Sequence, residues 1–143
     1  MPTVLIVDDE PDVQMFLRVA LETAGFVTIS AANGREAIDA IAAREPDVVL
    51  LDIMMPVLDG WAALEELHRE GVRPPVIVMT AKVDGDTRER ARELGVDDFV
   101  SKPFAPGEML ERVEDVLRHA RNPLAIRLVP PDHSTQAVPV FSM

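Results

Sequence analysis

Three short, unbroken runs of apolar and mostly β-branched residues constrain the fold of this chain more than any other feature. They are TVLIV at residues 3–7, VVLL at 48–51 and VIVM at 76–79. A strand with one solvent-exposed face alternates apolar and polar residues, whereas a strand buried on both faces is apolar throughout. The runs therefore predict central strands of a parallel sheet. Weaker runs at 27–31 and 99–101 predict two further strands.

Helical patterns separate these five runs. Apolar residues recur three and four positions apart, and the segment that follows the fourth strand is short and highly charged. The apolar stripes of four predicted helices span residues 13–21, 37–41, 61–67 and 109–120, and the charged helix covers residues 86–94. Strand and helix thus alternate five times. Because such crossovers are right-handed, they place helices on both faces of a single parallel sheet, which is an α/β fold.

The charge balance limits the classes of partner. The 143 residues include 14 Lys and Arg against 25 Asp and Glu, a formal net charge of −11. Such a surface repels nucleic acid and anionic membranes, so we expect no direct nucleic-acid binding by this chain and no membrane association. Divalent cations and basic protein patches are the expected partners.

Other compositional features indicate a cytoplasmic protein. No apolar run approaches the roughly 20 residues that a membrane-spanning helix needs. The first residues, MPTVLIVDDE, lack the basic and cleavage-site patterns of a signal peptide. There is no cysteine, which excludes disulfides and thiolate metal sites and agrees with a reducing compartment.

Polar residues follow directly on four of the five apolar runs. They are Asp8 and Asp9 after the first run, Asp52 after the third, Thr80 after the fourth, and Lys102 with Pro103 after the fifth. The carboxyl ends of parallel strands meet at one edge of a sheet, where ligands bind in open α/β folds. We therefore expect Asp52 to meet Asp8 and Asp9 there.

Three clustered carboxylates predict a cation site. They repel one another, and one lysine cannot offset them, whereas a hard divalent cation can. Oxygen ligands favour Mg²⁺, with Mn²⁺ as the alternative. A carboxylate beside such an ion has the parts for aspartyl-phosphate chemistry. Asp52 would be the nucleophile, while Thr80 and Lys102 would hold oxygens of the transferring phosphoryl group.

The DD after the first strand, the D of LLDIMMPVLDG, the T-A after the fourth strand and the K-P-F after the fifth occur in order. Over residues 3–120 this pattern resembles the receiver domain of two-component response regulators, of the single-domain, chemotaxis-regulator-like kind. The resemblance implies a flavodoxin-like (βα)5 fold with strand order 2-1-3-4-5. It also implies a phosphorylated signalling switch that assists its own phosphoryl transfer and dephosphorylation, and not a turnover enzyme.

The resemblance further implies a role for each site residue. Asp52 would accept a phosphoryl group from a sensor histidine kinase or a histidine phosphotransfer protein. Mg²⁺ would be held by Asp9, Asp52 and the backbone carbonyl of Met54, with Asp8 acting through water. Thr80 and Phe99 would form the switch pair, and Pro103 would follow a cis peptide bond. The face made by the fourth helix, fifth strand and fifth helix would then control a protein partner. The resemblance does not decide whether the chain also forms a homodimer.

The domain organisation leaves two readings. We assign residues 1–121 to the receiver domain and residues 122–143 to a Pro-rich tail without a recognisable output domain. That tail is too short for a helix-turn-helix domain. The protein is therefore either a stand-alone receiver or a fragment of a longer DNA-binding regulator.

Three rival readings follow from the same residues. A dehalogenase-like phosphatase carries a second carboxylate two positions after its nucleophile, where this chain has Met54. A flavin-binding protein of this fold would need a phosphate loop after the first strand. A degenerate, non-phosphorylated receiver acting as a binding module would lack site residues, and all five signature positions are filled here. Met54 and Lys82, which cannot activate a water, further predict slow loss of the phosphoryl group.

Overall fold

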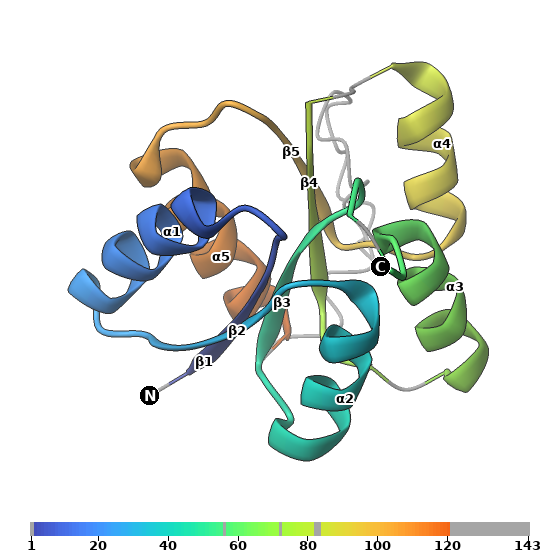
Figure 1. Cartoon of the computed structure of the whole chain (residues 1–143). Coiled ribbons are helices and arrows are strands. Elements are labelled where there is room, and N and C mark those ends of the chain that lie inside the picture. Colours follow the sequence, from blue (N-terminus) through green and yellow to red (C-terminus); the bar gives the residue numbers. More distant parts are fainter. Residues whose placement is uncertain (1, 56, 72, 82–83, 121–143) are drawn as a thin grey trace, which may run out of the picture.

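The computed structural model describes residues 2–55, 57–71, 73–81 and 84–120 (Figure 1). Strands and helices alternate along the chain as β1 Thr3–Val7, α1 Pro11–Thr23, β2 Val27–Ala31, α2 Gly34–Arg44, β3 Val48–Asp52, α3 Gly60–Glu70, β4 Val76–Thr80, α4 Gly85–Glu93, β5 Asp98–Ser101 and α5 Pro106–Ala120. The tail at 122–143 and Lys82 lie outside the described residues. No helix in the described ranges is both long enough and apolar enough to cross a membrane.

The five strands form one parallel sheet in the order β2-β1-β3-β4-β5. Helices α1 and α5 cover one face of this sheet, and α2, α3 and α4 cover the other (Figure 1). This is the flavodoxin-like (βα)5 arrangement that the family resemblance implied, and the strand order 2-1-3-4-5 is confirmed.

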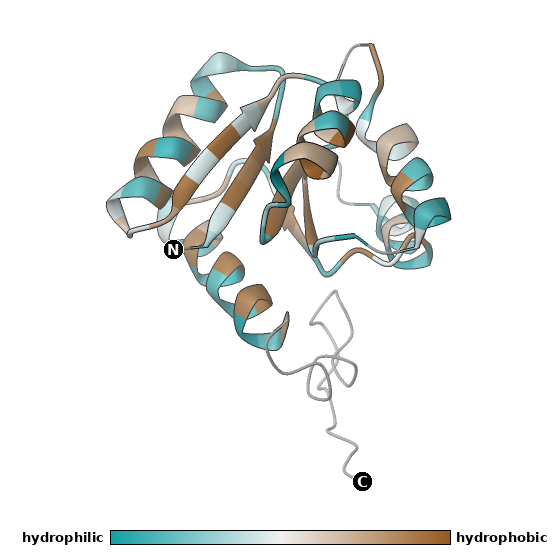
Figure 2. Ribbon diagram, turned by 90° about the horizontal axis from the view of Figure 1, so that it is seen from below, coloured by the Kyte–Doolittle hydropathy of each residue, from teal (hydrophilic) through white to brown (hydrophobic). Residues whose placement is uncertain are grey.

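The sheet is apolar on both faces because successive strand residues point to opposite sides. Val4 and Ile6 of β1 pack with Leu17 of α1 and the apolar stripe of α5. Leu5 and Val7 pack in the other cluster, which includes Leu64 of α3. Figure 2 shows the result, with hydrophobic strands between helices whose outer surfaces are hydrophilic. The unbroken apolar runs therefore did indicate burial on both faces.

Several boundaries differ by one residue from the prediction. β3 and β4 run one residue further, through Asp52 and Thr80, because the parallel pairing continues to the pairs Asp52–Met79 and Thr80–Ser101. β5 begins at Asp98, an acidic residue that propensity disfavours in a strand. Its carboxylate is compensated by Arg112 Nη1 of α5 at 2.7 Å.

Candidate functional site

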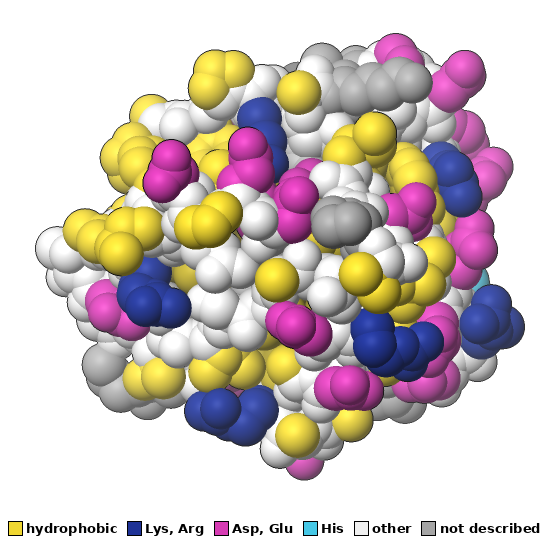
Figure 3. Space-filling model, in the orientation of Figure 1, with side chains coloured by type: hydrophobic (Ala, Val, Ile, Leu, Met, Phe, Trp, Pro, Cys, Tyr) yellow, Lys and Arg dark blue, Asp and Glu magenta, His cyan; other side chains and the backbone are white. Residues whose placement is uncertain are grey.

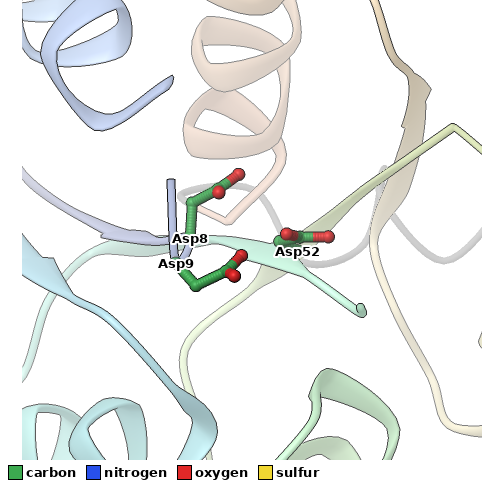
Figure 4. A group of neighbouring side chains, drawn as sticks. All are labelled: Asp8, Asp9 and Asp52. Atoms are coloured by element: carbon green, nitrogen blue, oxygen red, sulfur yellow. The ribbon is translucent and has the colours of Figure 1, made fainter. Parts of the chain in front are cut away.

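Three carboxylates converge at the carboxyl edge of the sheet. Asp8 and Asp9 follow β1 and Asp52 ends β3, so adjacent strands bring them together (Figure 4). One carboxylate oxygen of each lies within 4.8 Å of the others. Asp8 is fully buried and Asp52 is 4% exposed, whereas Asp9 is exposed. The cluster is therefore open to solvent on the side of Asp9.

Lys102 supplies the positive charge nearest to this cluster among the described residues. Its Nζ lies 2.8 Å from Asp8 Oδ2, 3.5 Å from Asp52 Oδ2 and 3.9 Å from Glu10 Oε1. Burial alone lowers the pKa of Lys102, but the hydrogen bond to Asp8 and the charges of Asp52, Asp8 and Glu10 together raise it above its ordinary value. The lysine is thus held as an ammonium ion that faces more negative charge than it can balance.

The pKa of Asp52 is raised above its ordinary value. Burial is the largest cause, and the charge of Asp8 adds to it. The Met54 N–H, which donates to Asp52 Oδ1 at 3.1 Å, and the ammonium of Lys102 act in the opposite direction without cancelling the rise. Ionised Asp52 is therefore incompletely compensated by the protein itself.

This donor set fits a hard divalent cation. The three ligands are carboxylate oxygens, which suit Mg²⁺ or Mn²⁺, and one of them is exposed to the solvent from which an ion would enter. An ion would supply the positive charge that Lys102 alone does not. Mg²⁺ ordinarily uses one or two carboxylates and completes its shell with water and phosphate oxygens. Asp9 and Asp52 would be those carboxylates, because the Oδ2 of Asp8 is already bonded to Lys102.

Neither Asp8 nor Asp9 is the N-cap of α1, although aspartate is a favoured residue at that position. The N-cap is Glu10, whose side chain makes no capping bond. Instead, Asp8 Oδ1 accepts from the Glu10 N–H at 2.9 Å. Both oxygens of Asp8 are thus engaged, one by backbone and one by Lys102, so Asp8 fixes the geometry of the cluster.

The other predicted residues lie on the next two strands. Thr80 is 1% exposed at the end of β4, and its carbonyl accepts from the Lys102 N–H at 2.8 Å. The Lys102–Pro103 peptide bond is cis, as the resemblance implied. Phe99 is 7% exposed on β5 and packs in the core cluster with Val78. Their roles as a switch remain predictions.

The segment after Asp52 approaches neighbouring backbone so closely that two glycines are required. A Cβ on Gly60 would lie 2.5 Å from Ile53 Cα and 2.6 Å from Asp52 O. A Cβ on Gly34 would lie 2.4 Å from Leu58 O, which accepts from the Gly34 N–H at 2.7 Å. The loop that carries Asp52 and Met54 is thus packed against the starts of α2 and α3. Within it, the side chain of Met54 is 67% exposed.

Sequence reasoning missed Gln14, which contacts the backbone at the end of β1 from α1. Its Nε2 donates to Asp8 O at 2.7 Å and to Ala31 O at 2.9 Å. The available signal was its spacing: Gln14 lies three and seven positions before Leu17 and Leu21, both buried on α1. A polar residue at the start of an apolar stripe is held close to the sheet, where backbone groups need partners.

Comparison with known proteins gives the chain its family. The response regulator receiver domain family model matches residues 4–114. A probable transcriptional regulator, ycf27, of Cyanophora paradoxa is 40% identical over 120 residues, which is 84% of this chain and 50% of that protein. The phosphate regulon transcriptional regulatory protein PhoB of Pseudomonas aeruginosa is 41% identical over 118 residues, 81% of this chain and 52% of that protein. The chain spans about half the length of these curated relatives.

A solved structure supports the same family assignment. The receiver domain of the Francisella response regulator 1452 superposes with a TM-score of 0.80 at 32% identity, covering 84% of this chain and 99% of that one. The family-model match at residues 4–114 includes all five strands except Thr3 of β1, together with Asp8, Asp9, Asp52, Thr80 and Lys102. The chain therefore belongs to the response regulator receiver domain family.

Proposed function

We propose that this receiver domain accepts a phosphoryl group on Asp52 from the phosphohistidine of a sensor histidine kinase or a histidine phosphotransfer protein. The observation that carries the proposal is the meeting of Asp8, Asp9, Asp52 and Lys102 at one edge of the sheet. The Asp52 carboxylate accepts from the Met54 N–H and lies 3.5 Å from Lys102 Nζ, whereas both oxygens of Asp8 are already engaged by Glu10 N–H and Lys102. The degenerate receiver is disfavoured because each residue needed for transfer is present.

In the proposed reaction, an Asp52 carboxylate oxygen attacks phosphorus in line with the phosphorus–nitrogen bond of phosphohistidine. The new oxygen–phosphorus bond forms as the old bond breaks, and the imidazole nitrogen keeps the electron pair. Lys102 and the Thr80 hydroxyl hold the oxygens of the moving group. Asp9, Asp52 and the Met54 carbonyl would hold Mg²⁺, with Asp8 acting through water, and the ion would neutralise negative charge at the site; Mn²⁺ would be the substitute. Because the pKa of Asp52 is raised, a cation also favours the ionised, nucleophilic form.

An apolar surface beside the acidic edge supports docking of the phosphodonor protein. Met15, Phe16 and Val19 of α1 are 58%, 40% and 56% exposed. A groove of about 450 Å³ runs from Phe16 to Phe104 and reaches Lys102. Hydrophobic side chains gather over α1 at the left of Figure 3. A partner seated on α1 would bring its phosphohistidine within reach of Asp52.

The output of the switch is proposed to lie on the α4–β5–α5 face. Thr80 would move toward the phosphoryl oxygens, and Phe99 would follow, which shifts the population between two arrangements of this face. A downstream protein, or a second copy of the chain, would bind one of the two arrangements in preference to the other.

We assign residues 1–121 to this receiver unit and 122–143 to a tail. The net charge of −11 supports partners other than nucleic acid for these residues.

The phosphoryl group is proposed to persist. Receiver domains are signalling switches and not turnover enzymes, so the lifetime of the aspartyl phosphate sets the duration of the signal. Met54 lies two positions after Asp52 and offers no group that holds an attacking water. In a Met54→Asn variant, the first-order decay of the phosphorylated protein with Mg²⁺ should be faster. An equal or slower decay would contradict this role for Met54.

One experiment tests the function directly. The protein is incubated with acetyl phosphate and Mg²⁺, and intact-mass spectrometry measures the gain of one phosphoryl group. Asp52→Asn should show no gain. Asp59→Asn is the matched control, because Asp59 caps α3 in the same loop and Asn is an equally good cap. A phosphoryl gain in Asp52→Asn equal to that of wild type would overturn the assignment.

A further inference from the structure

Gln14 joins the ends of two strands to α1 through a single side-chain amide. Its Nε2 donates to Asp8 O at 2.7 Å and to Ala31 O at 2.9 Å. Ala31 O also accepts from the Asp8 N–H at 3.1 Å. The amide therefore bridges the carbonyl of Asp8, the residue directly after β1, and the last carbonyl of β2 at the sheet edge that carries the site.

The orientation of this amide follows from its partners. Both partners are backbone carbonyl oxygens, which accept hydrogen bonds and cannot donate. Only the NH₂ end of Gln14 can face them, and its two hydrogens match the two acceptors. The contact therefore needs a side chain with two donors on one nitrogen and the length of glutamine. Methionine has the length without the donors, and asparagine has the donors at a shorter reach.

The contact controls the direction of the peptide unit between Asp8 and Asp9. The Asp8 carbonyl that Gln14 binds belongs to the same planar peptide unit as the Asp9 N–H. The hydrogen bond from Gln14 therefore fixes the orientation of the peptide plane that leads into Asp9. The carboxylate of Asp8 is already held by Lys102 and by the Glu10 N–H. Asp9 is exposed, and the backbone on its amino side is held through Gln14. Its aim toward Asp52 thus depends on a residue that touches no ligand.

We propose that Gln14 is a positioning residue that orients Asp9 for the divalent cation and so sets its affinity. The inference rests on the proposed function, because it takes Asp9 and Asp52 as the ligands. Gln14 does not touch the phosphoryl group or its oxygens. Its loss should therefore weaken cation binding and leave the chemistry at saturating cation nearly unchanged.

The test measures Mg²⁺ binding without any phosphodonor. Melting temperature is recorded against Mg²⁺ concentration for wild type and Gln14→Met, and the half-saturating concentration is extracted. Loss of a residue that orients a ligand typically weakens metal binding about 10-fold or more, so a rise of about that size is expected. In acetyl phosphate reactions, the half-saturating Mg²⁺ should rise equally while the maximal rate stays near wild type. Gln14→Asn gives the same test if Gln14→Met does not fold.

Arg18→Met is the matched control. Arg18 lies one turn further along α1 and donates from Nη2 to Ser30 Oγ of β2 at 3.2 Å, away from the Asp8 carbonyl. Its loss should leave the half-saturating Mg²⁺ unchanged. Unchanged Mg²⁺ binding in both Gln14 variants, or an equal rise in Arg18→Met, would overturn the role of Gln14 alone. A wild-type protein with no Mg²⁺-dependent shift would overturn the proposed function and this inference together.

Discussion

Helices α4 and α5 flank the same strand, β5, but they are held in place by different forces. α5 buries Met109, Val113, Val116 and Leu117 against the sheet. Among the nine residues of α4, Thr87 and Ala91 alone are buried. At about 25 cal/mol per Å² of apolar surface, burial accounts for much of the attachment of α5 and little of that of α4.

Directional polar contacts hold α4 instead. The guanidinium of Arg73 donates to the carbonyls of Leu94 and Gly95 just beyond its end. Arg90 stacks over the Trp61 ring of α3 at 4.5 Å and pairs with Glu65 at 3.1 Å. Such contacts are short-ranged and directional, so a small displacement of the helix is enough to break them. The face proposed to signal thus combines one helix held mainly by apolar burial with one held mainly by polar contacts.

The largest expected difference between the two helices is in global stability. Met109→Ala on α5 removes a side chain that is 1% exposed and should lower the free energy of unfolding by about 2–5 kcal/mol. Ala91→Gly on α4 should cost about 1 kcal/mol, mainly through backbone entropy. Urea unfolding of both variants measures the two losses. Equal losses would show that α4 is packed as firmly as α5.

Removing the contact at the end of α4 should have the next largest effect. Arg73 is partly buried, and its burial lowers the pKa of the guanidinium, although Asp97 opposes this. Arg73→Met should cost about 1.5–3 kcal/mol, the usual range for hydrogen bonds to charged groups. Amide hydrogen exchange should accelerate in α4 more than in α5. The control is Arg69→Met on the exposed surface of α3. Uniform acceleration in both helices would contradict a local tether.

A smaller effect is expected at the contact between α3 and α4. Arg90 and Glu65 have side chains that are about half exposed, so Arg90→Met should cost only about 0.5–1 kcal/mol. The fluorescence of Trp61 should change because its ring loses the stacked guanidinium. Glu65→Gln is the control, since it removes the ion pair and keeps the stack. A fluorescence change of the same size in both variants would assign the effect to the ion pair.

The smallest effect concerns the sheet edge that neither helix covers. The folded-state pKa of Asp52 lies above its ordinary value of 3.8. As pH rises from 3.8 through the raised value, the unfolded chain loses its proton first, so ionisation of Asp52 lowers folding stability. Asp52→Asn without Mg²⁺ should therefore be more stable than wild type at neutral pH, and the gain should vanish toward pH 3.8. Melting temperatures of both proteins, measured from pH 3.8 to neutral pH, test this prediction. If the stability advantage of Asp52→Asn increased toward acidic pH, the prediction would be wrong.

The sequence predicted what depends on burial and local chemistry. Unbroken apolar runs indicated a sheet buried on both faces, and apolar residues three and four positions apart indicated the helices that cover it. The acidic edge followed from topology, because residues that end parallel strands must share one edge. The expected meeting of Asp52 with Asp8 and Asp9 is what the structure shows.

Long-range polar contacts escaped prediction. Asp98 enters β5 because Arg112, fourteen positions later, pairs with it. Arg73 reaches the end of α4 across 21 positions. Nothing in the local pattern of an arginine indicates which distant carbonyl or carboxylate it will meet, since a long side chain is compatible with many partners. The packing that selects the partner exists only after the sheet has formed.

The close approaches at Gly34 and Gly60 have a consequence for saturation mutagenesis of this chain. A screen that scores phosphorylation would lose activity at both positions as sharply as at Asp52, although neither glycine has a functional group. A Cβ on Gly60 would displace the carbonyl of Asp52 itself, and one on Gly34 would displace that of Leu58. A map of mutational sensitivity would therefore suggest a chemical role for Gly34 and Gly60, although the surrounding backbone simply leaves no room for a Cβ atom at either position. Abundance measured in parallel would reveal how much of each loss comes from misfolding and how much from a displaced nucleophile.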